Sequence, residues 1–516
     1  MKKLPIGLQT FSELINDNHY YVDKTPLISK LAENGKYYFL SRPRRFGKSL
    51  LLSTLKSAFA GEEHLFKNLY LEKNWDWSKQ YPVIHISFGR GVMNSVERLS
   101  ETFLAILNEH AEDYGITLTA KGENSRLVEL IRALYKLKGL PVVVLVDEYD
   151  KPILDNLHNP EFAEIIRDEM RSIYSVLKDS DAYLKFVLLT GVSKFSKISL
   201  FSGLNNLRDI SLSSDYATLC GYTEQEIKDV FTERLDGVDF KELASWYNGY
   251  NFLGEKVYNP FAILLYLEKK RFKNYWFETG SPSFLLKLIR GSQYNVPDIE
   301  NICLSEEDLG DFDINDITLE TILFQTGYLT IDKVEEFDGD TLFYLTYPNR
   351  EVRTSLNHYI LRELVHSTPS SITRNRTDIR KALKQCDFEG LKQAFNALFA
   401  SIPHDWYRKN KMSLYEGYYA SIVYSCFCAL GLTVIAEDST NHGQIDLTVK
   451  LDNKIFIIEF KALDDKTQQG IALAQIKAKN YQQKYLNAEN EVFLIGMEFD
   501  KQQRNLVFFE TEALTA

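Results

Sequence analysis

The sequence predicts an α/β protein with a mostly parallel sheet in residues 1–222 and a second, smaller α/β unit at its end. Residues 37–40, 142–146 and 185–189 are short apolar runs, as strands buried on both faces require. Helical patterns separate these runs, which favours parallel strands joined by helices. Near the C-terminus, residues 445–449 and 454–461 predict two further strands followed by a helix.

Length and composition limit the classes of function. The chain has 516 residues, 45% hydrophobic and 25% charged, with a net charge of −11. This length suits about three domains, and the acidic balance argues against a basic surface over the whole protein. Five scattered cysteines without a C-x-x-C pair indicate a reducing compartment and no structural zinc. No apolar run reaches the ~18 residues of a membrane span, and no signal peptide is recognisable. We expect a cytoplasmic protein with no membrane partner.

The motif Gly47-Lys48-Ser49 lies where the strand 37–40 gives way to a helix with apolar residues at Leu51, Leu52, Leu55 and Phe59. It matches the second half of the phosphate-binding loop G-x-x-x-x-G-K-[ST]. Arg42 stands where that pattern has its first glycine.

Each residue type in this loop suits a nucleotide with its Mg²⁺. Gly47 lets helix N-terminal amides approach phosphate oxygens. We expect Lys48 to neutralise the β- and γ-phosphates and Ser49 to ligate Mg²⁺. The predicted ATP-binding set also contains Leu50 and the loop arginines Arg44 and Arg45, for which solvation at the surface is the alternative.

Two carboxylates, Asp147 and Glu148, follow the strand 142–146. We expect Asp147 to hold Mg²⁺ and Glu148 to polarise the attacking water. The alternative is an ordinary core strand that ends in a polar turn. At the end of the strand 185–189, Thr190 and Ser193 either sense the γ-phosphate or cap the next element, and both interpretations stay open.

The middle of the chain is mainly helical in pattern. Thr223 and Glu226 predict a capping box at the start of one helix. The aromatic clusters 246–250 and 275–278 suit core or lid packing better than base stacking. A helix and a small strand pair over residues 322–346 predict a winged-helix-like module. The basic segment 374–384 is either a nucleic-acid-binding patch or a solvated helix face.

A second constellation of polar residues follows residue 400. Glu459 and Lys461 are two apart on a strand and therefore share one face. Asp446 on the neighbouring strand and Glu416, near the start of an apolar helix, are expected to complete an acidic pocket. Because the strand is otherwise apolar, its charges need a functional reason.

These residue types suit phosphodiester hydrolysis that depends on Mg²⁺ or Mn²⁺. The predicted metal ligands are Asp446, Glu459 and Glu416. Lys461 would position water or stabilise the developing oxyanion. The following helix presents three expected substrate contacts, Gln475, Lys479 and Gln482.

The chain resembles bacterial AAA-ATPase-like proteins that carry a C-terminal PD-(D/E)XK nuclease domain. The motifs that carry the resemblance are YYVDKT, RPRRFGKS, LVDEYD, LLTGVSKFSK, LFSGLNNLRDIS, WYNGYNF, YWFETGSPSFL, LFQTGYLTI, YPNREVR and GQID…IEFK. The loop is also similar to the GPRRxGK[ST] loop of STAND-type signalling ATPases. By resemblance, Asp446, Glu459 and Lys461 form the nuclease core, Glu416 is the helix acid, and arginine at position 42 is usual. Gln444 replaces the arginine of a common G-R-x-D motif, so substrate contact at this position is expected to differ.

These observations predict four regions: a P-loop AAA-like ATPase domain (1–222), a helical extension (223–296), a winged-helix-like or linker region (297–372) and a restriction-endonuclease-like α/β domain (373–516). We expect ATP to regulate a Mg²⁺-dependent nuclease that cuts DNA rather than RNA. The alternative is a STAND-like signalling or scaffold ATPase whose C-terminal domain binds nucleic acid or protein without cutting.

The charge of the C-terminal region bears on its partners. Residues 401–516 contain 12 lysines and arginines against 15 aspartates and glutamates. Because such a surface binds nucleic acid weakly on its own, we expect help from the segment 374–384, a homo-oligomer or an activating protein partner.

Overall fold

The structure is a computed structural model. It describes residues 1–194, 204, 206–277, 295–310, 314, 318–402, 416–463, 469–486, 489–501 and 503–514. The chain forms two compact units, Met1–Thr279 with Cys303–Asn349 and Gly280–Ile302 with Arg350–Ala516. The predicted division into four regions has other boundaries than these two units and stays a prediction.

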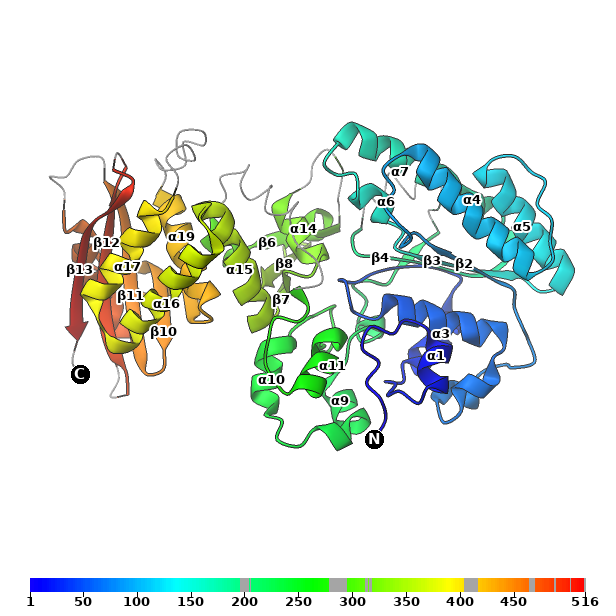
Figure 1. The fold of residues 1–516 in the computed structure, drawn as a ribbon, viewed down its shortest axis with the longest axis horizontal. Helices are drawn as coiled ribbons and strands as arrows, with labels where there is room; N and C mark the ends of the chain where they lie inside the picture. The colour runs from blue at the N-terminus through cyan, green and yellow to red at the C-terminus, as the bar shows by residue number, and fades with distance from the viewer. Residues whose placement is uncertain are drawn as a thin grey trace. The chain divides into compact units, whose positions relative to one another are not determined.

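A five-stranded parallel sheet is the centre of the first unit (Figure 1). The strand order is β2-β3-β4-β1-β5, with the bounds Val83–Ser87, Val142–Asp147, Leu184–Gly191, Tyr37–Ser41 and Arg208–Asp209. Every neighbouring pair is parallel, which confirms the predicted parallel sheet. Strand β4 lies between β1 and β3, so the ends of these three strands meet at one edge of the sheet.

Helices cover both faces of this sheet. Figure 1 shows α1 and α3 on one side and α4, α5 and α7 on the other. The helices of this part of the unit are α1 (Phe11–Asn16), α2 (Thr25–Asn34), α3 (Lys48–Ala60), α4 (Val96–Asp113), α5 (Glu123–Lys138), α6 (Lys151–Leu154) and α7 (Pro160–Asp179). The predicted apolar stripe of α3, Leu51, Leu52, Leu55 and Phe59, is buried against the sheet, as helical spacing requires.

A smaller helical cluster follows in the same unit, formed by α9 (Glu224–Val230), α10 (Phe240–Tyr247) and α11 (Pro260–Lys269). The predicted capping box of Thr223 and Glu226 is present at the start of α9. The aromatic residues of the two predicted clusters that the structure describes pack largely into cores, and Tyr247, Tyr250 and Trp276 are buried. Packing rather than base stacking is therefore their role.

The first unit also holds a three-stranded antiparallel sheet of order β6-β8-β7. Its elements are β6 (Cys303–Ser305), α13 (Glu306–Gly310), α14 (Leu319–Gln325), β7 (Thr330–Phe337) and β8 (Asp340–Thr346). The predicted helix and strand pair are present as α14 and the β7–β8 hairpin. The winged-helix-like assignment itself stays a prediction.

The second unit is built on a five-stranded mixed sheet of order β13-β12-β11-β10-β9. The strands are β9 (Thr433–Thr440), β10 (Gly443–Leu451), β11 (Lys454–Leu463), β12 (Glu491–Asp500) and β13 (Asn505–Leu514). Strands β11 and β12 are parallel and the other pairs are antiparallel. The helices are α15 (Arg350–Val365), α16 (Pro369–Gln385), α17 (Phe388–Ala400), α19 (Glu416–Ala429) and α20 (Ile471–Ala478).

Alternation along β11 assigns its side chains to the two faces of this sheet. Phe456 stacks with Phe493, which contacts Phe388 of α17. Ile457, on the other face, shares a core with Ile476 of α20. The residues in odd positions of β11 therefore face α20, and those in even positions face α17.

Candidate functional sites

The loop between β1 and α3 has the backbone of an anion-binding turn. Gly47, the residue before α3, has a φ of 96°, in the left-handed region that favours glycine. Because α3 begins at Lys48, its first amides face back toward the loop. Amides at a helix N-terminus bind anions. The predicted phosphate-binding residues 47–50 therefore lie at the start of a regular helix.

Asp147, the last residue of β3, contacts the start of α3 and the end of β4. Ser49 Oγ, just after the loop, donates to Asp147 Oδ2 at 2.6 Å, and Thr190 Oγ1 at the end of β4 donates to Asp147 Oδ1 at 2.9 Å. The pair that the sequence assigns to Mg²⁺, Ser49 and Asp147, is thus in direct contact. This arrangement places two hard oxygen donors at one point, as Mg²⁺ requires.

Lys48 is buried and folds back over its own loop. Its Nζ donates to Arg42 O at 2.8 Å and to Pro43 O at 3.0 Å. Burial lowers the pKa of Lys48, and the negative charges of Asp147 and Asp150 oppose that effect. The ammonium group therefore lies inside the loop on which a phosphate would rest.

Glu148 follows Asp147 in the sequence and is half-buried. Its φ of 54° is unusual for a residue with a side chain, and such strain is concentrated at functional sites. Burial raises the pKa of Glu148, and the charge of Asp147 raises it further. A carboxylate with raised basicity suits the predicted role of polarising a water molecule.

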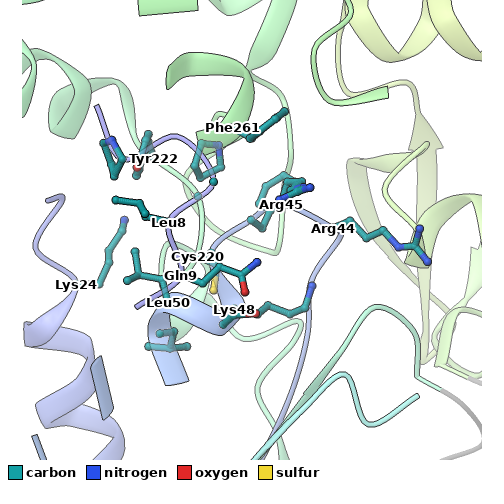
Figure 2. Close-up of a pocket in the computed structure, with 18 of the residues that line it drawn as sticks. Leu8, Gln9, Lys24, Arg44, Arg45, Lys48, Leu50, Cys220, Tyr222 and Phe261 are labelled. Atoms are coloured by element: carbon teal, nitrogen blue, oxygen red, sulfur yellow. The ribbon is translucent and has the colours of Figure 1, made fainter. Parts of the chain in front are cut away.

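A cavity of about 430 Å³ opens at this loop. Polar residues such as Lys48, Ser49 and Glu148 line it together with apolar or aromatic residues such as Leu8, Tyr222, Phe261 and Leu264. Figure 2 shows Lys48, Leu50, Leu8 and Gln9 around this space, with Tyr222 and Phe261 across it. A lining that combines polar and apolar residues suits a nucleotide, whose phosphates and base differ in the same way.

The two loop arginines differ in orientation. Arg45 is exposed, with its Cζ 5.0 Å from the centre of the Phe261 ring at the cavity wall. In Figure 2 the Arg44 side chain extends away from the other labelled residues. The Arg44 carbonyl accepts a hydrogen bond from Trp276 Nε1 at 2.9 Å. Arg45 is thus the better placed of the two to meet a ligand.

Arg42, which replaces the first glycine of the loop pattern, is fully buried. Its Nη1 donates to Ser41 O at 2.9 Å and to Ser211 O at 2.7 Å, and its Nη2 donates to Tyr216 O at 3.1 Å. The guanidinium lies 3.9 Å from the centre of the Phe252 ring, and burial lowers its pKa to about 10. Arg42 therefore braces the loop from behind.

The two predicted sensor residues contact different acids. Thr190 contacts Asp147, whereas Ser193 Oγ donates to Asp150 Oδ2 at 2.7 Å. Sequence reasoning did not select Asp150, although it belongs to the LVDEYD motif. The signal that identifies it is its complete burial, which only the fold reveals. Phosphate sensing by either residue stays a prediction.

The second site lies on β11 of the second unit. Glu459 is buried and Lys461 is partly exposed, both on the face toward α20. The predicted hairpin is present, because β10 and β11 pair antiparallel with Leu447 opposite Ile458. Asp446 Oδ2 accepts a hydrogen bond from Phe460 N at 2.7 Å, which fixes it beside this pair.

Glu459 is the electrostatic centre of this site. Its Oε1 accepts hydrogen bonds from Gln475 Nε2 and from Lys461 Nζ, the latter at 3.3 Å. Its Oε2 is buried and has no hydrogen-bond partner among the described residues. Burial, and then the charge of Asp446, raise the pKa of Glu459 to about 7. An acid held in this way is stabilised as a carboxylate when a cation binds.

Helix α20 delivers side chains to Glu459. Of the predicted substrate contacts, Gln475 donates to the Glu459 carboxylate, Lys479 is exposed, and Gln482 Nε2 donates to Asn480 Oδ1. Contact with substrate stays a prediction for all three. Tyr481 is an addition that sequence reasoning missed. Burial and the charge of Glu459 raise the pKa of the Tyr481 phenol. No sequence signal marks this tyrosine, because it lies on the short 3-10 helix Tyr481–Lys484 after α20 and only tertiary packing brings it to the site.

Two carboxylates of this site can donate oxygens to a divalent cation. Asp446 and Glu459 supply hard oxygen donors, and the unpartnered Glu459 Oε2 fits a cation. In the part of the chain that the structure describes, no three His, Cys, Asp or Glu side chains gather as a metal site. The side chain of Glu416, the third predicted ligand, lies outside the described residues, although its backbone begins α19.

Other buried acids of this unit have structural partners. Glu498 accepts hydrogen bonds from Gly470 N at 3.0 Å and Ala472 N at 2.9 Å, and so caps α20. Asp438 binds Thr448 Oγ1 at 2.6 Å and also contacts Lys484 and Tyr485. These contacts indicate structural roles for Glu498 and Asp438, in contrast to the proposed roles of Asp446 and Glu459.

The basic segment 374–384 lies on α16, which packs on α17. Arg376 is partly buried, donates to Ala429 O at the end of α19 and contacts His358 Nδ1 at 2.8 Å. Arg374, Arg380, Lys381 and Lys384 are exposed. Since α17 covers the even face of β11, this exposed stripe and Glu459 belong to opposite faces of the sheet.

The two folds and their sites define a P-loop ATPase-like domain joined to a domain of the PD-(D/E)XK type. A family model described as "Predicted AAA-ATPase" matches residues 5–201, and one described as "PD-(D/E)XK nuclease superfamily" matches residues 414–509. The chain belongs to the family of AAA-ATPase-like proteins with a C-terminal PD-(D/E)XK nuclease-superfamily domain.

A relative spans the whole chain. A protein of Azotobacter chroococcum mcd 1, described as "Uncharacterized protein in vnfD 5'region", is 49% identical over 514 residues. The match covers 99% of each chain, so both domains occur together in that protein as well. Among the described residues, no helix combines the length and apolarity needed to cross a bilayer.

Proposed function

We propose that this protein binds and hydrolyses ATP and thereby regulates a Mg²⁺-dependent nuclease, with DNA preferred to RNA as the substrate. The observation that carries the proposal is the arrangement around Glu459. A buried acid with an unpartnered oxygen, a second carboxylate at Asp446 and the ammonium of Lys461 meet inside the segment that matches the nuclease superfamily.

The nucleotide site supports the regulatory part of the proposal. Mg²⁺ held by Ser49 and Asp147 would neutralise charge on the β- and γ-phosphates. Lys48 and the first amides of α3 bind the phosphates, and Glu148 accepts a proton from the attacking water. Thr190 holds the Asp147 carboxylate in one orientation through its 2.9 Å hydrogen bond.

The residues of the C-terminal site support the proposed hydrolysis of phosphodiester bonds. A divalent ion held by Asp446 and Glu459 would activate water and neutralise the developing phosphate charge. Lys461 is partly exposed next to these acids, so its ammonium can contact a phosphodiester or orient the water. Gln475 fixes the Glu459 carboxylate from α20.

Metal-dependent cleavage tests the nuclease part. Linear DNA, supercoiled DNA and single-stranded RNA are incubated with the full chain in Mg²⁺, Mn²⁺ or EDTA. We expect DNA cleavage that EDTA abolishes and that Lys461→Ala lowers by a factor of 10² or more. Lys477→Ala, which changes an exposed lysine of α20 that pairs with Glu512 away from the site, is the matched control. Equal cleavage by wild type and Lys461→Ala would reject this assignment.

One observation favours the alternative of a signalling or scaffold ATPase. The region around the C-terminal site, residues 401–516, carries more acidic than basic residues, which weakens binding to nucleic acid. On this reading the domain binds nucleic acid or protein without cutting. ATP turnover that protein stimulates, with no cleavage of any substrate, would support it.

A further inference from the structure

We propose that Asp150 is a positioning residue of the nucleotide site, whose carboxylate holds the turn after β4 against the end of β3. The inference rests on the proposed ATPase function. It assigns a role to the last acid of the LVDEYD motif, which the chemistry at Asp147 and Glu148 does not use.

The contacts of Asp150 converge on this turn. Its Oδ2 accepts three hydrogen bonds, from Val192 N at 2.9 Å, from Ser193 N at 2.7 Å and from Ser193 Oγ at 2.7 Å. A carboxylate that accepts several bonds fixes its donors more firmly than a neutral group does. Asp150 is 1% exposed, so water does not compete for these bonds.

The residue before Asp150 holds the same turn from another direction. Tyr149 N donates to Thr190 O at 3.0 Å, and its hydroxyl donates to Ser193 O at 2.8 Å. A Cβ atom at Gly191 would lie 2.4 Å from the Tyr149 ring and 2.7 Å from Asp150 Oδ1. The turn therefore needs glycine at position 191 to approach this dipeptide so closely.

The turn after β4 adjoins one predicted sensor, Thr190, and contains the other, Ser193. Thr190, one of the last two residues of β4, holds the Asp147 carboxylate, and Val192 and Asp150 line the nucleotide cavity. Displacement of the turn would therefore move Thr190 away from Asp147. Asp150 acts on hydrolysis through Thr190, without a contact of its own to the reacting atoms.

A second connection leads away from the site. Lys194 N, one residue beyond the turn, donates to Gln325 Oε1 of α14 at 2.9 Å, and Lys194 Nζ lies 3.0 Å from Asp209 Oδ2. The Asp150 contacts thus fix the start of a path from the cavity to α14.

Hydrogen–deuterium exchange of the full chain tests the role without relying on activity. We expect the amides of Val192 and Ser193 to exchange at least tenfold faster in Asp150→Ala than in wild type. Asp150→Asn retains an acceptor and should give a smaller increase. Asp155→Asn removes a nearby carboxyl that does not contact the turn and should leave this exchange unchanged. Unchanged exchange in Asp150→Ala would overturn the inference.

Kinetics then separate a positioning role from a merely structural one. Asp150→Asn should lower kcat for ATP hydrolysis at least tenfold while the Kd for a fluorescent ATP analogue stays within threefold. Ser193→Ala should act in the same direction, and the double variant should match Asp150→Asn, because Ser193 acts through this carboxylate. Equal losses of kcat and of binding capacity would indicate misfolding and reject the role. Absence of turnover in wild type would reject the proposed function alone, since the exchange result still decides the inference.

Discussion

At the scale of single residues, burial gives the acids of this chain different roles. Glu459 and Glu148 both have raised pKa values, and burial is the largest cause for each. Glu498 is equally buried but spends both oxygens on backbone amides. An acid with an unpartnered oxygen is the one that gains most from a cation. Among the buried acids of the second unit, the free acceptor rather than burial alone supports the proposed role of Glu459.

The raised pKa of Glu459 predicts a pH effect on stability. Without metal, its pKa rises from 4.5 unfolded to about 7 folded, so the folded state binds the proton more tightly. This contribution is complete below pH 4.5 and is lost as the pH rises through 7. In EDTA, Glu459→Gln should therefore raise the free energy of unfolding relative to wild type by about 1–3 kcal/mol at pH 8, and by much less at pH 4.5.

Thermal unfolding at the two pH values measures this difference. Lys479→Gln, which removes a charge from an exposed position near the site, serves as the control. A Glu459→Gln effect that is independent of pH would contradict the assigned pKa.

Arg42 yields a second prediction at this scale. A glycine at this position would restore the usual loop pattern, but it would leave the buried carbonyls of Ser211 and Tyr216 without their donor. We expect Arg42→Gly to destabilise the first unit by about 3 kcal/mol or more. Urea unfolding measures the change, with the exposed Arg44→Gly as the matched control. A variant as stable as wild type would show that Arg42 does not brace the loop.

At the scale of elements, local pattern predicted much of the structure. The strands β1, β3 and β4, the period of α3 and the β10–β11 hairpin all follow from residue spacing. The shared face of Glu459 and Lys461 follows from strand alternation. In contrast, the neighbours of Asp150 and Tyr481 are brought close to them by tertiary packing. No local period encodes such contacts, so the sequence could not predict them.

Gln475 illustrates the same limit within one element. Its position on the helix after β11 was predicted, yet its partner was not. Only the placement of α20 over β11 shows that Gln475 reaches Glu459, and its contact with substrate stays a prediction.

The cap on α20 gives a prediction at this scale. Glu498 binds Gly470 N and Ala472 N at the start of this helix. Glu498→Ala would leave those amides unpaired, at an expected cost of about 2–3 kcal/mol. Because α20 carries Gln475, we also expect cleavage to fall at least tenfold. Thermal unfolding followed by far-UV circular dichroism measures stability, and the DNA-cleavage assay measures activity.

A control variant distinguishes loss of the cap from a general loss of stability. Glu512→Ala removes the salt-bridge partner of Lys477 on α20 and should change neither stability nor cleavage appreciably. Full activity in Glu498→Ala would show that the cap does not position Gln475.

At the scale of the whole molecule, two compact units each hold one candidate site. The relative from Azotobacter chroococcum mcd 1 matches 99% of the chain, so the two kinds of domain are joined in both proteins. The exposed cations of α16 lie on the face of the second sheet opposite Glu459, so they are not part of the candidate cleavage site.

The coupling of ATP to cleavage is the central claim of the proposed function. The measurement that tests this claim most directly is DNA cleavage by wild type, Lys48→Ala and Lys461→Ala in Mg²⁺, each with and without ATP. We predict that ATP changes the wild-type rate at least fivefold. Lys48→Ala should keep cleavage but lose its dependence on ATP, whereas Lys461→Ala should lose cleavage under both conditions and retain ATP turnover. Cleavage by wild type that is the same with and without ATP would contradict regulation of the nuclease by the ATPase.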